Sequence, residues 1–413
     1  MAANPDSIFE TIEFTLNGSP VEALPGETIL QAAQRTGVEI PHLCYTDGLR
    51  ANGNCRACMV EIDGERVLAP SCCRNPTPGM VVNSENERAQ KSQKLVLELL
   101  LSDMPEQSYT LENELTYWAD KIAVRNPRFK PRHQPAADLS HPAIVVNLDA
   151  CIQCTRCLRA CRETQVNDVI GLAHRGHHAE IVFDIGDPMG ESSCVACGEC
   201  VAACPTGALT NATGAHKVAA DREVDSVCPY CGVGCLLTYH VKDDRILRVE
   251  GRDGPANFNR LCVKGRYGFD YVNHPQRLLK PLIRKAGVPK GLNEHFDPAD
   301  PSKMFREASW EEAMELASGG LRKIKDELGG AGLAGFGSAK GSNEEAYLFQ
   351  KLVRVGFGTN NVDHCTRLCH ASSVAALLEG IGSGAVSNQV EDVKHAEVFL
   401  VIGSNPTTNH PVA

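Results

Sequence analysis

Several features are scarce in this chain of 413 residues, and each scarcity narrows what the protein can be. Aromatic residues make up 5%, so large rings contribute little to its interiors. Lys and Arg number 41 against 51 Asp and Glu, and the formal charge of −10 argues against nucleic acid or an anionic membrane surface as a partner. No stretch approaches the roughly 18 consecutive apolar residues of a membrane span, and the nearest candidate, 95–101, contains Glu98.

Cysteine, in contrast, is abundant, while the remaining composition is ordinary. Hydrophobic residues at 43% and charged residues at 22% suit globular protein, and the length suggests about two to four domains. Nineteen cysteines would suit a secreted disulfide scaffold. However, they fall into C-x2-C runs, and residues 1–10 contain neither a twin arginine nor an apolar stretch that would predict export. We therefore predict a cytoplasmic protein with reduced thiols.

The sharpest pattern is a tandem repeat of C-x2-C-x2-C-x3-C, the spacing of a two-cluster bacterial ferredoxin. In such ferredoxins the fourth cysteine of each run ligates the other cluster. One [4Fe–4S] cluster is therefore predicted on Cys151, Cys154, Cys157 and Cys204. The other is predicted on Cys194, Cys197, Cys200 and Cys161. A pair of zinc sites is the alternative, although zinc motifs usually separate their cysteine pairs by a longer loop.

The N-terminal part predicts a β-grasp ferredoxin. Residues 11–16 alternate between apolar and polar and end at the hairpin signal Asn17-Gly18; a second strand is expected at 21–24 and a short helix before Gly37. A loop with the spacing C-x10-C-x2-C-x13-C follows, whose C-x2-C core matches plant-type [2Fe–2S] ligands. The predicted ligands are Cys44, Cys55, Cys58 and Cys72, and the neighbouring Cys73 is expected to be a packed spare thiol.

The middle of the chain predicts a linker and a further cluster. Residues 86–126 read as helical, with Leu95 and Leu99 on an apolar stripe, and four prolines between 127 and 142 predict a stiff connection. Beyond the tandem repeat, three close thiols and one distant thiol suit a [4Fe–4S] cluster, with zinc again the alternative. These thiols are Cys228, Cys231, Cys235 and Cys262.

From about residue 301 the pattern becomes α/β. A capping box at Ser309 predicts an amphipathic helix with Ala313, Leu316 and Leu321 facing inward; a strand is expected at 333–336 and a helix at 346–355. The apolar run 397–402 is typical of a strand buried in a parallel sheet. At its carboxyl end, backbone N–H groups would face a pyrophosphate, or the segment is an ordinary turn. This segment is Gly403, Ser404, Asn405 and Pro406.

The N-terminal cysteine loop resembles a known domain. The runs 41–45, 53–58 and 70–72 are similar to the N-terminal domain shared by soluble formate dehydrogenases, the large iron–sulfur subunit of respiratory complex I and some hydrogenases. That resemblance implies one more cluster, held by one His and three Cys spaced H-x3-C-x2-C-x5-C. The corresponding positions cannot bind iron, because they are Met104, Ser108, Leu111 and Tyr117. A relay station of the family is therefore predicted to be missing.

The C-terminal part resembles the molybdopterin-dependent oxidoreductases. The resemblance implies that Lys264, two residues after Cys262, lies between cluster and pterin; a solvated surface lysine is the alternative. In molybdopterin formate dehydrogenases a Cys preceded by Arg and an apolar residue ligates the metal and is followed by His. The matching residues imply Cys369 as ligand of Mo or W and His370 as the group that orients formate or handles its proton. Cys365 is then expected to be a buried neutral thiol.

Together the motifs resemble the N-terminal part of the catalytic subunit of soluble NAD-dependent formate dehydrogenases. The resemblance implies oxidation of formate to carbon dioxide at a Mo or W bis-molybdopterin guanine dinucleotide. It also implies one [2Fe–2S] and three [4Fe–4S] clusters that pass electrons to a flavin- and NAD-binding iron–sulfur subunit. The alternative is a non-catalytic electron-transfer subunit of a hydrogenase or complex I type assembly. We expect a fragment of a longer subunit, with a natural truncation as the alternative.

The expected architecture is an α+β multidomain protein. Residues 1–85 form the β-grasp [2Fe–2S] ferredoxin domain, and 86–140 a helical linker without the His–Cys cluster. Residues 141–220 form the two-[4Fe–4S] ferredoxin domain, and 221–285 the molybdopterin-family [4Fe–4S] domain. Residues 286–413 are expected to begin an α/β molybdopterin domain.

Overall fold

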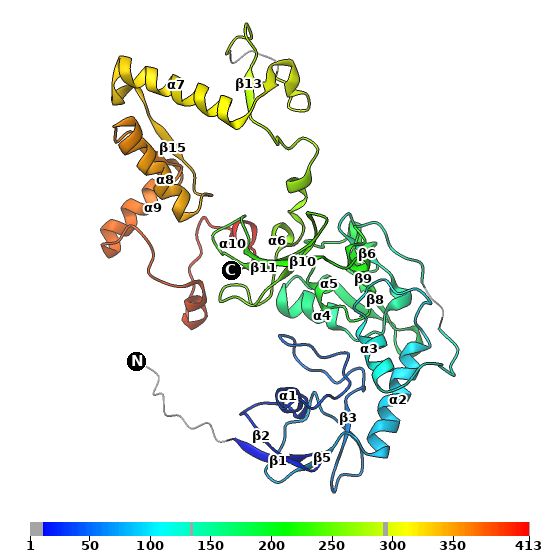
Figure 1. The fold of residues 1–413 in the computed structure, drawn as a ribbon. Helices are drawn as coiled ribbons and strands as arrows, with labels where there is room; N and C mark the ends of the chain where they lie inside the picture. Colours follow the sequence, from blue (N-terminus) through cyan, green and yellow to red (C-terminus); the bar gives the residue numbers. More distant parts are fainter. Residues whose placement is uncertain (1–10, 133–134, 292–295, 413) are drawn as a thin grey trace. The chain divides into compact units, whose positions relative to one another are not determined.

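A computed structural model describes residues 11–132, 135–291 and 296–412 (Figure 1). The chain divides into two compact units. The first unit contains residues 1–226 and 235–267, and the second contains 227–234 and 268–413. The stretch 1–10, where no export signal is predicted, lies outside the described residues. In the described part of the chain, no helix combines the length and apolarity needed to cross a membrane.

The first unit begins with the predicted β-grasp domain. Strands β1 (Ile12–Leu16) and β2 (Ser19–Ala23) form an antiparallel hairpin. Its turn residues Asn17 and Gly18 have φ of 52° and 80°, which suits the Asn-Gly preference of such turns. The five-stranded sheet has the order β2-β1-β5-β3-β4 and is completed by β3 (Met59–Ile62), β4 (Ala69–Pro70) and β5 (Val81–Asn83). Helix α1 (Ile29–Arg35) packs its apolar residues into the core of this domain.

Two helices follow the β-grasp domain, and one prediction about them is wrong. Helices α2 (Glu87–Leu101) and α3 (Glu114–Lys121) fall within the predicted helical region. Leu95 and Leu99 do not form the buried stripe, since they are 41% and 45% exposed. The buried row contains Gln93 and Leu97, and the Gln93 amide donates to the Met59 carbonyl of β3. Leu95 lies two positions before Leu97, about 200° around the helix, so this packing turns it outward.

The ferredoxin domain is built from two similar halves. Strand β6 (Ile144–Val146) pairs with β9 (Leu209–Asn211), and β7 (Ile170–Ala173) pairs with β8 (Glu180–Phe183). Short helices α4 (Arg156–Arg159) and α5 (Glu199–Ala203) begin within the two cysteine runs. The described residues between 127 and 142 form no helix, as their prolines predict.

A small antiparallel sheet ends the first unit. Its strand order is β10-β11-β12, from β10 (Arg222–Val227), β11 (Leu236–Lys242) and β12 (Arg245–Gly251). Helix α6 (Val263–Tyr267) follows Cys262 directly. Cys262 therefore lies between β12 and α6, outside any strand.

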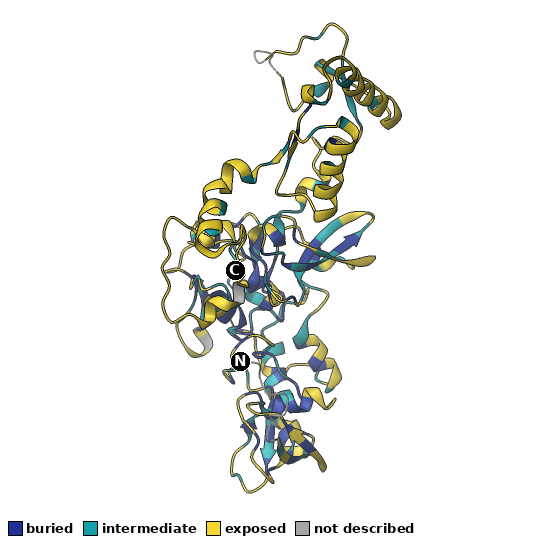
Figure 2. Cartoon of the chain, turned by 90° about the vertical axis from the view of Figure 1, so that its left-hand side faces the viewer, coloured by how far each residue is buried: buried dark blue, intermediate teal, exposed yellow. Residues whose placement is uncertain are grey.

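The second unit consists of short strand pairs and helices. Strand β13 (Leu282–Arg284) pairs with β14 (Phe305–Glu307). Strand β15 (Gly335–Gly337) lies parallel to β16 (Val362–His364). Its helices are α7 (Trp310–Leu328), α8 (Asn343–Lys351), α9 (Thr366–Ile381) and α10 (Pro406–Asn409). None of these four helices has a buried residue, as their yellow colour in Figure 2 shows for the longer ones.

Two expectations about burial in the second unit are wrong. Ser309 caps α7 as predicted, but Leu316 and Leu321 are 60% and 38% exposed. Residues 397–402 form no strand and are exposed, with Leu400 at 84%. A strand needs a hydrogen-bonding neighbour, and among the described residues β15 and β16 pair only with each other. The apolar pattern alone therefore does not produce a buried strand here.

Candidate metal centres

The structure brings together the four thiols predicted to hold the [2Fe–2S] cluster. Hydrogen bonds from Cys55 and then Cys72 lower the pKa of Cys44 to about 2. A hydrogen bond from Cys72 lowers the pKa of Cys58 to about 7, while the bond to Cys44 and burial raise that of Cys55. Each sulfur therefore has another sulfur of the group as a close neighbour. Thiols that share protons in this way fit a site that binds them as thiolates.

The backbone around these thiols also suits an anionic centre. The N–H groups of Cys44 and Ala57 donate to the Cys55 sulfur at 3.4 and 3.5 Å. Between them Arg56 adopts a φ of 60°, which lets successive N–H groups turn toward one point. Cys73 lies in a surface turn and is exposed, so the expectation of a packed thiol is wrong; its sulfur lies 3.5 Å from that of Cys72.

The first predicted [4Fe–4S] group surrounds a cavity in the ferredoxin domain. All four of its predicted thiols line this cavity, together with apolar residues such as Ile152 and Leu209. Burial raises the pKa of the Cys151 thiol to about 11, and the Cys204 sulfur is among the charges that raise it further. The fourth cysteine of the second run therefore lies beside the first run, as the exchanged ligation predicts.

The second group shows the reciprocal arrangement. Burial raises the pKa of Cys194 and Cys200, and both also feel the charge of Cys161, the fourth cysteine of the first run. The pKa of Cys197 rises to about 12 because of burial. In the described part of the chain, no three His, Cys, Asp or Glu side chains are arranged to hold a single metal ion. Ligation by each of the cysteines stays a prediction.

The two ferredoxin runs share one backbone conformation. Gln153 and Ala196 occupy the same place in their runs and have φ of 55° and 53°. Their N–H groups donate to the sulfurs of Cys151 and Cys194, each at 3.4 Å. Two residues later Thr155 adopts φ 61°, as Gly198 does at 76° in the second run. Left-handed backbone in non-glycine residues is uncommon, so its repetition indicates loops shaped around a common kind of centre.

The positions of the family's additional cluster hold no such site. Leu111 and Tyr117 are 62% and 52% exposed, and the Ser108 hydroxyl donates to a nearby carbonyl. Met104 packs against a buried apolar cluster that contains Leu97, Leu115, Trp118, Cys44 and Cys154. Where the family resemblance implies the His of a further centre, this chain has Met104 packed against an apolar cluster.

Three buried arginines beside the thiols escaped the sequence analysis. Arg132 donates to the carbonyl of Cys151 at 2.7 Å, and Arg156 and Arg159 project from α4. All three are 5–8% exposed. The sequence did offer one signal for this. Arg156 and Arg159 lie inside a cysteine run, so their long side chains must lie near the ligand loops.

The cysteine group that begins at Cys228 is divided between the two units. Cys228 and Cys231 belong to the second unit, and Cys235 and Cys262 to the first. Lys264 on α6 is exposed. Arg266, one half-turn later, is 4% exposed, donates to the Cys197 carbonyl at 2.8 Å and forms an ion pair with Glu199 at 2.6 Å. The sequence analysis did not anticipate this role of Arg266.

Cys369 lies in the first turn of α9, directly after parallel strand β16. Its sulfur is exposed and 3.8 Å from Nε2 of His370. Cys365 is exposed as well, so the expected burial of that thiol is wrong. It lies where β16 ends, and its sulfur accepts a hydrogen bond from the Ala339 N–H at 3.3 Å. Since Ala339 follows β15, the loops after both parallel strands meet at Cys365.

The segment from Gly403 forms a turn and a helix cap. Gly403 has φ 63°, and the Asn405 side chain accepts a hydrogen bond from the Thr408 N–H at 3.3 Å at the start of α10. Ser404 and Pro406 are exposed. This geometry matches the ordinary turn, and binding of pterin phosphates here stays a prediction.

Comparison with known protein families assigns the modules in the order seen along the chain. Residues 10–87 match a 2Fe-2S iron-sulfur cluster binding domain, and 141–210 match the ferredoxin-like domain of NADH-quinone oxidoreductase subunit 3. Residues 221–274 match the molybdopterin oxidoreductase Fe4S4 domain, and 277–413 match molybdopterin oxidoreductase. The chain belongs to the molybdopterin oxidoreductase family. The predicted family and order of modules are thereby confirmed.

Individual relatives extend the comparison. The protein named "Putative formate dehydrogenase SH0748" of Staphylococcus haemolyticus is 31% identical over 98% of this chain and 44% of its own length. "Probable oxidoreductase YjgC" of Bacillus subtilis is 32% identical over 96% of this chain and 43% of its own length. The chain thus spans less than half the length of these relatives. A crystal structure of an NAD+-reducing [NiFe]-hydrogenase is 27% identical, with a TM-score of 0.46, and the match covers 49% of this chain and 87% of that one.

Proposed function

We propose that this chain oxidises formate to carbon dioxide as part of a molybdopterin enzyme of the cytoplasm. One observation carries the proposal: Cys369 presents an exposed thiol with the His370 imidazole 3.8 Å away, at the carboxyl end of a parallel strand. Ligands of open α/β sheets bind at such strand ends. The names of relatives such as the Staphylococcus haemolyticus protein support formate as the substrate.

The residues around Cys369 suit a metal ligand. A thiolate is a soft ligand, and an exposed sulfur is open to a bulky centre. Arg367, two residues before Cys369, forms an ion pair with Asp363 at 2.7 Å, which holds its charge near the proposed ligand. When bound, a Mo or W bis-molybdopterin guanine dinucleotide would supply the two-electron chemistry that formate oxidation needs. His370 would orient the formate carboxylate or take up the released proton.

The thiol groups of the first unit form the remainder of the proposed machinery. Their ligands would hold one [2Fe–2S] and two [4Fe–4S] clusters, and the group from Cys228 would hold a third [4Fe–4S]. Clusters of this kind carry electrons singly, so we propose a flavin- and NAD-binding iron–sulfur subunit as the partner that receives them. Lys264, exposed and two residues after Cys262, would lie between this last cluster and the pterin.

The test is anaerobic addition of formate to the complex purified from its host, followed by the iron–sulfur absorbance. We expect formate to bleach this absorbance in the wild type and in Cys365→Ala. Cys369→Ala should retain its iron, lose its Mo or W, and no longer respond. Bleaching of Cys369→Ala by formate would contradict the ligand assignment. A wild type bleached by NADH but not by formate would replace the proposal with a non-catalytic electron-transfer subunit.

A further inference from the structure

Two arginines of α4 lie deeper than arginines usually do. Arg156 and Arg159 are each 5% exposed, and charged side chains are rarely buried so far without a specific partner. Both lie between Cys154 and Cys161, inside the first ferredoxin run. Their guanidinium groups reach across to the loop of the β-grasp domain that contains Cys44.

Arg159 joins one thiol group to the other. Its Nη2 donates to the carbonyl oxygen of Cys44 and, at 3.4 Å, to that of Cys154. Its Nη1 donates to the carbonyl of Arg50. One planar guanidinium therefore binds the backbone of a predicted [2Fe–2S] ligand and that of a predicted [4Fe–4S] ligand. The fixed geometry of its N–H donors suits this double attachment, which a lysine ammonium on its flexible stem does not reproduce.

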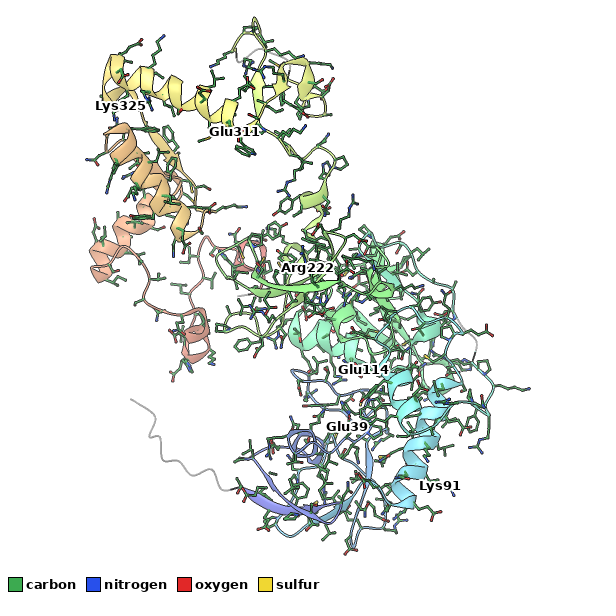
Figure 3. All side chains as sticks on the ribbon, in the orientation of Figure 1. Glu39, Lys91, Glu114, Arg222, Glu311 and Lys325 are labelled. Carbon is green, nitrogen blue, oxygen red and sulfur yellow. The ribbon has the colours of Figure 1, made fainter. Side chains whose placement is uncertain are left out.

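Further side chains cross between the same two loops. Arg156 donates to the Leu43 carbonyl at 3.3 Å and binds both oxygens of Glu114 at 2.7 and 2.8 Å; Glu114 is labelled in Figure 3. The Asn54 amide donates to the Gln153 carbonyl at 2.6 Å, and that of Asn52 to the Thr155 hydroxyl at 2.9 Å. These contacts tie residues 43–54 to residues 153–159 at several points.

The interior between the two loops is apolar. Cys44 and Cys154 belong to one buried cluster with Leu43, Ala57 and Ile152. Met104, the position of the family's missing histidine, packs against the outside of this cluster. Instead of a further centre between the two thiol groups, the structure has direct contact between their ligand loops.

The charge of Arg159 supplies a second, independent observation. Among the described residues its guanidinium donates to carbonyl oxygens alone, and its buried Nε has no hydrogen-bond partner. A buried cation without an anion is costly. Thiolate-ligated clusters carry negative charge, so the predicted sites on both sides of Arg159 would offset this cost. The residues present therefore fit clusters at both positions.

We infer that Arg159 is a positioning residue that holds the Cys44 and Cys154 loops together. This contact makes the two predicted centres direct neighbours. Electron transfer between them then does not need the family's missing relay. The inference rests on the proposed ligation of these centres. When bound, they would exchange one electron, which oxidises one centre and reduces the other without moving a proton or breaking a bond. Arg156, Asn52 and Asn54 reinforce the same contact.

The test compares Arg159→Met with a matched control, Arg162→Met, in the full chain with its clusters. Arg162 lies three residues further along, is exposed and pairs with Asp168 at the surface. The first readout is the spin coupling between the reduced [2Fe–2S] centre and its neighbour, measured by electron paramagnetic resonance. The second is hydrogen exchange of the amides in 43–50. We expect Arg159→Met to lose the coupling and to exchange roughly tenfold faster at equal iron content, since bonds from charged donors are strong. Arg162→Met should match the wild type in both.

The other possible results also support or overturn the inference about Arg159. Wild-type coupling and exchange in Arg159→Met would overturn the inference. If Arg159→Met loses iron, the double variant Asn52→Ala/Asn54→Ala takes its place; a smaller increase in exchange supports the contact, and no change in exchange or coupling overturns it. A wild type without a [2Fe–2S] signal would contradict the proposed ligation instead. Hydrogen exchange would then still report whether Arg159 holds the two loops, because it needs no cluster.

Discussion

The predicted cluster thiols of the first unit and Cys369 of the second unit differ in how far they are exposed. In the first unit most predicted ligand thiols are buried among apolar residues, and the sulfurs of Cys55, Cys151 and Cys194 accept hydrogen bonds from N–H groups of their own loops. In the second unit Cys369 lies at the surface of α9, and Leu368 beside it is 95% exposed. The cluster ligands of the first unit thus come with a protein interior of their own, whereas Cys369, the candidate ligand of Mo or W, is presented on an open surface.

Helices α2 and α7 show that local signals do not explain this difference. Asn86 caps α2 and Ser309 caps α7, and each side chain accepts a hydrogen bond from the backbone of the first turn. Both helices have an amphipathic sequence, yet α2 buries Leu97 completely and α7 buries no residue. Caps and propensity determine where a helix begins, while burial requires a partner surface.

The largest effect should follow the loss of one ligand thiol in the first unit. Cys204→Ala is expected to lose the iron of one [4Fe–4S] cluster and to destabilise the unit by on the order of 5 kcal/mol, because metal binding is coupled to folding. Iron analysis and the thermal unfolding midpoint measure both effects. Cys73→Ala, which changes an exposed thiol outside the predicted set, is the control and should leave the iron unchanged. A full iron content in Cys204→Ala would contradict the predicted exchanged ligation.

The second largest effect is expected when a buried ion pair is broken, and an exposed ion pair provides the comparison. Arg266→Met leaves Glu199, 8% exposed, without its partner, and we expect a loss of about 3–5 kcal/mol in the free energy of unfolding. Arg306→Met breaks the exposed pair with Glu312 in the first turn of α7 and should change stability little. Denaturant unfolding of both variants measures the contrast. Equal effects would contradict the difference in burial between the units.

A third comparison truncates one leucine in each helix. Leu97→Ala in α2 should cost about 2–5 kcal/mol, because it leaves a cavity in the core beside Cys44 and Cys154. Leu316→Ala in α7 should change the stability of the 413-residue chain by less than about 0.5 kcal/mol. Thermal unfolding distinguishes the two. A large loss in Leu316→Ala would mean that α7 packs against a surface in solution.

The smallest effect concerns pH in the β-grasp domain. Burial, followed by the hydrogen bond to Asp47, raises the pKa of Tyr45 from 10.0 to about 12. The folded state therefore favours the neutral phenol, and this stabilisation is complete below pH 10 and is lost as the pH rises to about 12. The unfolding midpoint of the wild type should fall more steeply over this range than that of Tyr45→Phe. Parallel curves would show that Tyr45 titrates normally.

Features that depend on nearby residues were predicted correctly more often than features that depend on distant parts of the chain. The Asn17-Gly18 hairpin, the helix cap at Ser309 and the cysteine runs depend on neighbours a few residues apart, and each lies where the sequence predicts. Misplaced expectations, such as burial of Cys365 and of residues 397–402, depend on a partner surface. Periodicity identifies a face that is suited to burial but not the element that covers it.

The sequence by itself predicted the thiol groups, because ligand spacing within a loop is a local property, and it determined that the His and Cys residues of one relay of the family are absent. Only the tertiary structure showed that the Cys44 and Cys154 loops contact each other directly. Arg159 lies 115 residues from Cys44 along the chain, and no periodicity connects them. The fold places the buried Arg159 guanidinium next to the carbonyl oxygens of Cys44, Arg50 and Cys154. A buried charged group needs hydrogen-bond partners, and here the folded loops supply them.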